Sequence, residues 1–155
     1  MPLKAAAAPL VITLTQGSAD AFVQSSVLTG LSGNQAYNLV GVAWQFASTV
    51  VDTNNVEYTW HINRRSKAAI ALLSDTDIIM LFGFQMKLTT SGASHNERAG
   101  YWKPEVQIPI VEETLYACLD STSSSTANTV ILRLDVELDT MQPIDRLNLI
   151  TRSLT

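Results

Sequence analysis

The sequence predicts an all-β fold, an antiparallel sandwich in a single domain, and three observations support this prediction. Residues 130–139 alternate apolar and polar side chains from Leu132 to Asp139, as a strand with one buried face and one wet face does. Further extended segments recur along the chain, with turn residues between them about every 8–12 residues. A chain of 155 residues, of which 46% are hydrophobic, is also long enough to bury one core without disulfides or metal.

The first two strands follow an N-terminal arm, residues 1–9, whose alanines give it nothing to bury. Residues 10–16 alternate and place three aliphatic side chains inward. The turn at residues 17–20 separates this strand from residues 21–29, which end at a turn rich in Gly and Asn, residues 30–34.

The next two strands are strongly apolar and contain two tryptophans that we expect in the core, Trp44 and Trp60. Residues 37–48 are apolar on both faces, which predicts a central strand covered on both sides. Residues 56–63 alternate, with the aromatic and aliphatic side chains on one face. A short polar turn lies between the two segments and predicts that they pair as a hairpin.

The middle of the chain gives a weaker pattern. Residues 68–73 are rich in Ala and Leu but short for a helix, so they remain ambiguous. Residues 78–90 read as a strand with a bulge at Gly83. A polar loop is expected at residues 91–103, and residues 105–110 are an expected edge strand, because neighbouring prolines remove ladder donors.

The C-terminal part combines the strongest strand pattern with a helical one. Residues 111–120 and 130–139, joined by the polar insert 121–128, predict a long antiparallel hairpin. Residues 141–155 are predicted to form a short helix or tail that packs on the body or on a neighbour, because apolar residues recur there at helical spacing. These residues are Ile144, Leu147, Ile150 and Leu154.

About eight strands with short connections predict an eight-stranded jelly roll over residues 10–140, followed by the C-terminal helix or tail. Only 15% of the residues are charged, below the roughly 25% usual for a soluble domain. A surface poor in charge is typical of subunits that partners cover, although a β surface rich in Ser and Thr is an equally good explanation. The net charge is −4, and neither end carries a run of Lys and Arg.

Cys118 is the only cysteine, so no intrachain disulfide is possible, and its place in a predicted strand favours a packed, inert thiol. The N-terminal apolar run is short for a signal peptide, and no segment reaches the roughly 18 apolar residues of a membrane span. We therefore expect intracellular synthesis and no membrane span.

The densest basic cluster comprises His61, Arg64, Arg65 and Lys67, beside Tyr58 and Trp60. Basic residues next to aromatic ones are able to bind phosphates and stack bases. A solvated loop or a salt-bridged interface is the more ordinary explanation. Arg64, Arg65 and Lys67 are accordingly candidates for nucleic-acid or interface contacts.

The remaining polar residues give no strong pattern for chemistry, so we predict no enzyme, no cofactor and no metal. Asp75 and Asp77 are spaced to share a calcium ion, but they lack the full loop spacing and fit turn formation better. His95 and Glu97 make half a metal site. Glu112 and Glu113 point to opposite faces of a strand, and no nucleophile elbow or phosphate loop occurs.

Trp102, in a predicted loop beside Tyr101, is a candidate interface anchor or ligand platform. In the predicted C-terminal helix, Leu147 and Ile150 are the candidate interface anchors.

The strand number, the C-terminal hairpin, the N-terminal arm and the low charge together resemble a single jelly-roll viral capsid protein, over roughly residues 10–140. The resemblance is architectural. It implies a structural protein that self-assembles into a shell as a homo-oligomer, with other capsid proteins as possible partners. Its location would then be the virion, after synthesis in the host cytoplasm. The basic arm that many small capsid proteins use to hold a genome is missing here, so nucleic-acid contact is expected to be weak or indirect.

Two alternatives to the shell subunit remain. One is a β-sandwich carbohydrate-binding module, which would use Tyr101, Trp102 and nearby polar loops. The other is an accessory domain of an enzyme, with an unknown ligand.

Overall fold

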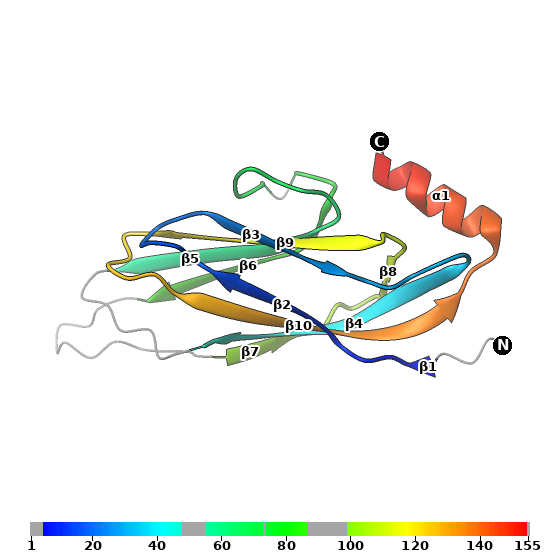
Figure 1. The fold of residues 1–155 in the computed structure, drawn as a ribbon, viewed down its shortest axis with the longest axis horizontal. Helices are drawn as coiled ribbons and strands as arrows, with labels where there is room; N and C mark the ends of the chain where they lie inside the picture. Colours follow the sequence, from blue (N-terminus) through cyan, green and yellow to red (C-terminus); the bar gives the residue numbers. More distant parts are fainter. Residues whose placement is uncertain (1–4, 48–54, 73, 87–98, 155) are drawn as a thin grey trace.

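The computed structural model describes residues 5–47, 55–72, 74–86 and 99–154. These residues form two antiparallel β-sheets packed face to face, with one helix at the C-terminal end (Figure 1). In chain order the elements are β1 (Ala5–Ala6), β2 (Leu10–Thr15), β3 (Val23–Leu28), β4 (Gln35–Phe46), β5 (Val56–Asn63), β6 (Ile78–Met86), β7 (Ala99–Trp102), β8 (Ile108–Ile110), β9 (Thr114–Thr122), β10 (Thr129–Thr140) and α1 (Pro143–Leu154).

The order of the strands is that of a jelly roll. In sheet A, β10 and β4 are central; β1 and β2 lie one after the other along the outer edge of β10, and β7 and β8 do the same along β4. Sheet B has the order β3-β9-β5-β6. The chain therefore changes sheets six times, at β2/β3, β3/β4, β4/β5, β6/β7, β8/β9 and β9/β10. This confirms the predicted sandwich and its eight-stranded jelly-roll arrangement, in which each sheet has four positions.

The core lies between the sheets and is filled by the inward side chains of the alternating strands. Trp44 and Phe46 from β4 meet Tyr58 and Trp60 from β5, with ring centroids 5.0 Å apart for Trp44–Trp60 and 5.1 Å apart for Phe46–Tyr58. Aromatic pairs of this kind contribute about 0.5–1.5 kcal/mol beyond the burial of their area. The prediction that both tryptophans belong to the core is confirmed, since Trp44 is 3% and Trp60 is 0% exposed.

Two predicted hairpins are wrong. The segments assigned to one C-terminal hairpin are β9 and β10, but β9 pairs with β3 and β5, whereas β10 pairs with β1, β2 and β4. Likewise β4 belongs to sheet A and β5 to sheet B. Alternation shows which face of a strand is buried, but it carries no information about the strand beside it, and a short polar connection can cross a sandwich as well as turn within a sheet.

The predicted polar loop at residues 91–103 is wrong at its end, because Ala99–Trp102 form β7, paired with β4. Gly100 explains why four residues with little alternation can pair there. The indole of Trp44 lies directly against its backbone, and a Cβ built on Gly100 would be 2.5 Å from that ring. Residues 68–72 and 74, in the ambiguous segment and just beyond it, form bends and a turn and no helix.

The prediction for β4 is half right. This strand is central, with β10 on one edge and β7 and β8 on the other. It is not covered on both faces, because Gln45 is exposed on the outer face of sheet A. On that face Gly41 is buried under the ring of Tyr101, which crosses from β7.

Candidate functional site

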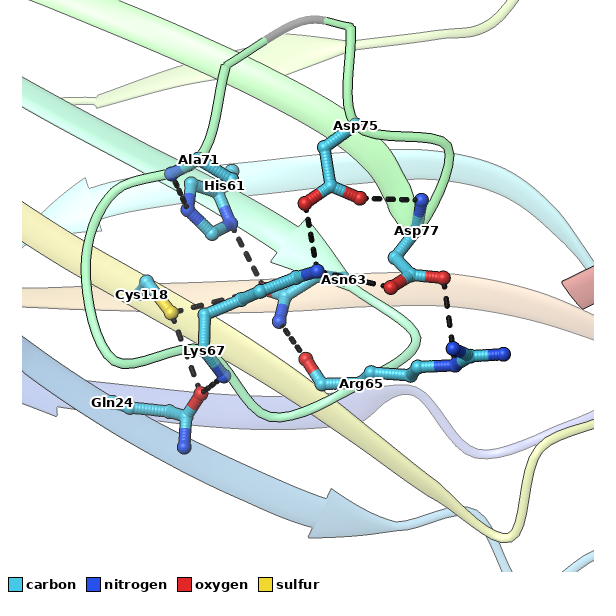
Figure 2. Close-up of polar contacts among 9 residues, drawn as sticks. All are labelled: Gln24, His61, Asn63, Arg65, Lys67, Ala71, Asp75, Asp77 and Cys118. Carbon is cyan, nitrogen blue, oxygen red and sulfur yellow. Dashed lines mark hydrogen bonds and ion pairs between the residues drawn. The ribbon is translucent and has the colours of Figure 1, made fainter. Parts of the chain in front are cut away.

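The candidate basic residues lie at the start of the connection between β5 and β6, whose described residues, 64–72 and 74–77, fold back over the outer face of sheet B (Figures 1 and 2). Around it lies a set of polar side chains that we call the loop cluster. Its members are Gln24, His61, Asn63, Arg65, Lys67, Asp75, Asp77 and Cys118.

Each of the three candidate basic side chains, Arg64, Arg65 and Lys67, forms an ion pair with a carboxylate of the same chain. Lys67 Nζ lies 2.7 Å from Asp75 Oδ2 and 2.9 Å from Asp77 Oδ2, and Arg65 Nε lies 3.6 Å from Asp77 Oδ1 (Figure 2). Arg64 lies outside the loop cluster and donates to Glu112, at 2.8 Å. These cations are therefore structural partners within the chain, which leaves little free positive charge for phosphates.

The ion pair between Lys67 and Asp75 raises the pKa of the lysine and lowers that of the aspartate. Hydrogen bonds to Asp75 and then Asp77 raise the pKa of Lys67. The hydrogen bond from Lys67, followed by one from the backbone N–H of Asp77, lowers the pKa of Asp75. That second bond joins a side chain to the backbone two residues on, which is the turn-forming role expected of this aspartate.

His61 lies beneath the loop and is 0% exposed. Its Nε2 accepts a hydrogen bond of 3.2 Å from the backbone N–H of Ala71, so its Nδ1 carries the proton and donates to Asn63 Oδ1 at 2.9 Å. Burial lowers the pKa of His61, against the opposing effect of the bond to Asn63. The sequence pattern places His61 on the wet face of its strand, and only the folding of the loop over that face buries it.

Cys118 is also 0% exposed, directly opposite His61 in the strand pairing. Its thiol donates to Gln24 Oε1 at 3.6 Å, and burial raises its pKa to about 11. A thiol this difficult to ionise is a poor nucleophile, in agreement with the predicted inert, packed cysteine.

Metal-binding geometry is missing from the part of the chain that the structure describes, where no group of three or more His, Cys, Asp or Glu side chains could hold an ion. The carboxylates of Asp75 and Asp77 both pair with the ammonium group of Lys67, and they do not form a site for a metal ion. The other predicted half-site, His95 and Glu97, lies outside the described residues.

The aromatic residues of β7 divide between the two faces of sheet A. Trp102 is half-buried and packs against the core, whereas Tyr101 is 56% exposed on the outer face. A shallow depression beside β7 on that face has mostly small or aliphatic side chains around it, among them Val11, Ala43, Ala99 and Ile131. Tyr101, rather than Trp102, is therefore the aromatic side chain of β7 that a partner or ligand would meet.

Helix α1 stands off one end of the sandwich and does not lie along a sheet (Figure 1). Two apolar side chains of its first half, Ile144 and Leu147, are 67% and 61% exposed. Ile150 is half-buried, and Leu149 lies near Pro109 and Met141 where the helix meets the body. Of the two candidate anchors on this helix, Leu147 is thus free of the body and Ile150 is partly covered.

Over the described ranges, the structure contains no helix with the length and apolar character that a membrane span requires.

Comparison with known proteins leaves the family open. No family model and no curated protein matches the sequence. Among solved structures, a crystal structure of dimeric latent PorU from Porphyromonas gingivalis matches 87% of this chain, with 13% sequence identity and a TM-score of 0.46. The chain spans 13% of the length of that protein. A likeness at this level assigns neither a family nor an activity.

Proposed function

We propose that this protein is a structural subunit that self-assembles into a shell, as the capsid protein of a virus does. In this proposal the jelly roll forms the wall and the chain ends join neighbouring subunits. The observation that carries it is helix α1, which leaves the sandwich with Ile144 and Leu147 exposed. An apolar stripe on a helix is stable in water only when another surface covers it.

The distribution of charge supports the same proposal. Only 15% of the residues are charged, and the cations of the β5–β6 connection are already paired within the subunit. Such a surface tolerates close contact between identical copies, because little charge must be desolvated at an interface. It also favours a shell whose genome contact is weak or indirect. The proposed location is the virion, after synthesis in the cytoplasm of the host.

The experiment is a measurement of particle mass at micromolar concentration by light scattering, with electron microscopy of the same sample. We expect a large, uniform particle for the parent chain. Replacing Leu147 and Ile150 with Ser should weaken the assembly and leave the β-sheet circular dichroism spectrum largely unchanged. Deleting residues 1–8 should weaken it too, with a small loss of β-sheet signal because β1 is removed from the edge of sheet A. Each interface lost would have buried at least about 1,000 Å².

The matched control is Leu72→Ser, because Leu72 is 76% exposed in the connection between β5 and β6, away from α1. This variant should assemble like the parent. A parent that stays monomeric, alone and with other proteins of its own source, would end the shell proposal.

One observation favours a second candidate, a carbohydrate-binding module. Tyr101 presents its ring on the outer face of sheet A, where an aromatic platform could stack on a sugar. A monomeric parent that binds an oligosaccharide, with binding lost in Tyr101→Ala and kept in Tyr101→Phe, would establish this alternative.

A further inference from the structure

We propose that His61 is an acid-sensitive latch, which holds the connection of residues 64–77 closed over sheet B while its ring is neutral and releases it when the ring takes up a proton. This inference concerns the fold of a single subunit and does not rest on the proposed shell function.

The latch fastens the connection to β5 at two points (Figure 2). One nitrogen of His61 accepts from the backbone N–H of Ala71, in the middle of the connection. The other nitrogen donates to Asn63 Oδ1, and Asn63 Nδ2 in turn donates to the carbonyl of Arg65 near its start. A single neutral imidazole therefore links both attachments, and each of its nitrogens has a defined role.

Protonation would break this arrangement because an imidazolium has two donors and no acceptor. The N–H of Ala71 would then face another N–H across 3.2 Å. The ring is 0% exposed, so water could not solvate the new charge while the connection remains closed. Opening is the change that removes both penalties together.

Charged and titratable groups approach the ring from several elements. The connection itself contributes Lys67, which disfavours a positive ring, and Asp75, which favours one. From β9, Cys118 lies opposite and carries a neutral thiol. The neighbour on β6 is the apolar Leu81, and β3 contributes the uncharged Gln24. Desolvation outweighs the bond to Asn63, so the balance keeps the pKa of the buried ring low.

The direction of the pH dependence follows from this balance. When the connection is open, water surrounds His61 and its pKa returns to about 6.5. The open state then binds more protons than the closed state at any pH between the two values. The equilibrium constant for opening should be constant above pH 7 and should rise by up to about tenfold for each unit below pH 6.5.

Amide hydrogen exchange of residues 64–77 tests the latch, measured on the full chain from pH 7.5 to 4.5 and corrected for the intrinsic effect of pH on exchange. In the parent we expect protection in this segment to fall below pH 6.5, while β4 and β10 stay protected. His61→Gln is the matched variant, because a Gln amide supplies both N–H donors and a carbonyl acceptor but does not titrate in this range. Its protection should not depend on pH.

Asp75→Asn separates the latch from the ion pairs, since it removes a carboxylate partner of Lys67 and leaves the imidazole in place. If His61 is the titrating group, the fall in protection below pH 6.5 should persist in this variant, from a lower starting protection. A step that disappears in Asp75→Asn and remains in His61→Gln would overturn the proposal, as would protection that is independent of pH in the parent.

A second measurement avoids any change at His61. The chain has two histidines, so His95→Gln leaves one imidazole to follow by NMR. We expect the neutral tautomer with its proton on Nδ1 at pH 7.5, and protonation that coincides with the loss of protection in residues 64–77. Titration of the ring near its ordinary pKa without any change in exchange would refute the latch.

Discussion

At the scale of single residues, Gly100 and Gly41 each lie under an aromatic ring, but the two rings differ in their freedom to move. The indole over Gly100 belongs to Trp44, which is packed in the core. The ring over Gly41 belongs to Tyr101, which is half in solvent and is held at one side only.

We therefore predict that Gly100→Ala lowers the free energy of unfolding by about 1–3 kcal/mol, because its Cβ would overlap a ring that cannot leave. Gly41→Ala should cost less than about 1 kcal/mol, since Tyr101 can swing into water. Gly17→Ala, at a position with nothing within 4 Å, is the control. Urea unfolding measures all three, and equal losses in Gly100→Ala and Gly41→Ala would contradict the argument.

Cys118 provides a prediction about alkaline pH. Its folded pKa of about 11 lies above the ordinary thiol value, so the folded state holds its proton more tightly than the unfolded state. The stability that follows is complete below pH 8 and is lost as the pH rises towards 11. Urea unfolding between pH 8 and 11 should show a steeper loss in the parent than in Cys118→Ala. Lys67, whose pKa is also raised in the folded state, adds a loss that begins near its unfolded pKa of about 10.4, and this loss remains in the variant.

At the scale of elements, α1 is a helix of 12 residues that stands off one end of the sandwich, and helices of this length are marginal in water on their own. Its N-cap position is Gln142, which is not a favourable capping residue. We predict fast amide exchange in residues 143–154 of the dissociated subunit. If the chain assembles as proposed, exchange should slow in the particle, where a neighbour would cover the exposed side chains.

Gln142→Ser tests whether a better N-cap stabilises α1. A Ser hydroxyl could accept from the backbone N–H of Asp145, which now donates to the Gln142 carbonyl, and such a cap contributes about 0.5–2 kcal/mol. Exchange in the helix of the free subunit should slow several-fold, with no change in the strands. Unchanged exchange would mean that contacts with the body, and not the cap, determine the stability of α1.

The strands were largely predictable because burial on one face imposes a period of two residues. The expected segment 56–63 coincides with β5, and residues 130–139 lie within β10. What the pattern could not provide is the partner of each strand, since β9 and β10 show the same alternation whether they pair or face each other across the core. β7 was missed because its pairing depends on the bare backbone of Gly100 under a ring from another strand.

In the candidate site too, the sequence showed contacts between residues close in the chain but not contacts between distant ones. The basic residues of the β5–β6 connection are visible in the sequence, and Asp75 and Asp77 follow within ten residues of Lys67. The partner of Arg64 is Glu112, 48 residues away, and only the fold brings them together. His61 occupies a position that alternation assigns to solvent, so its burial had no local signal.

At the scale of the whole molecule, the paired cations and the net charge of −4 predict weak binding to nucleic acid. Even if all three cations contacted phosphates, a log–log plot of affinity against salt would have a slope of only about −3 for duplex DNA. A fluorescence titration of duplex DNA over a salt series should give a slope closer to zero than this limit. Glu112→Gln should make it steeper by up to about one, because Arg64 is then free. A tight complex of the parent at physiological salt would contradict this prediction.

The edges of sheet A affect how readily another chain can pair with this sheet. Each outer edge is made of two short strands with an interruption between them, β1 and β2 on one side and β7 and β8 on the other. Proline lies in the first interruption, at residue 9, and within β8, at residue 109, where it offers no N–H. A broken row of donors and acceptors is a poor template for another strand, so growth into fibrils along this sheet is disfavoured. Sheet B differs, because its edge strand β6 (Ile78–Met86) is continuous, so backbone pairing with another chain is more accessible there than along sheet A.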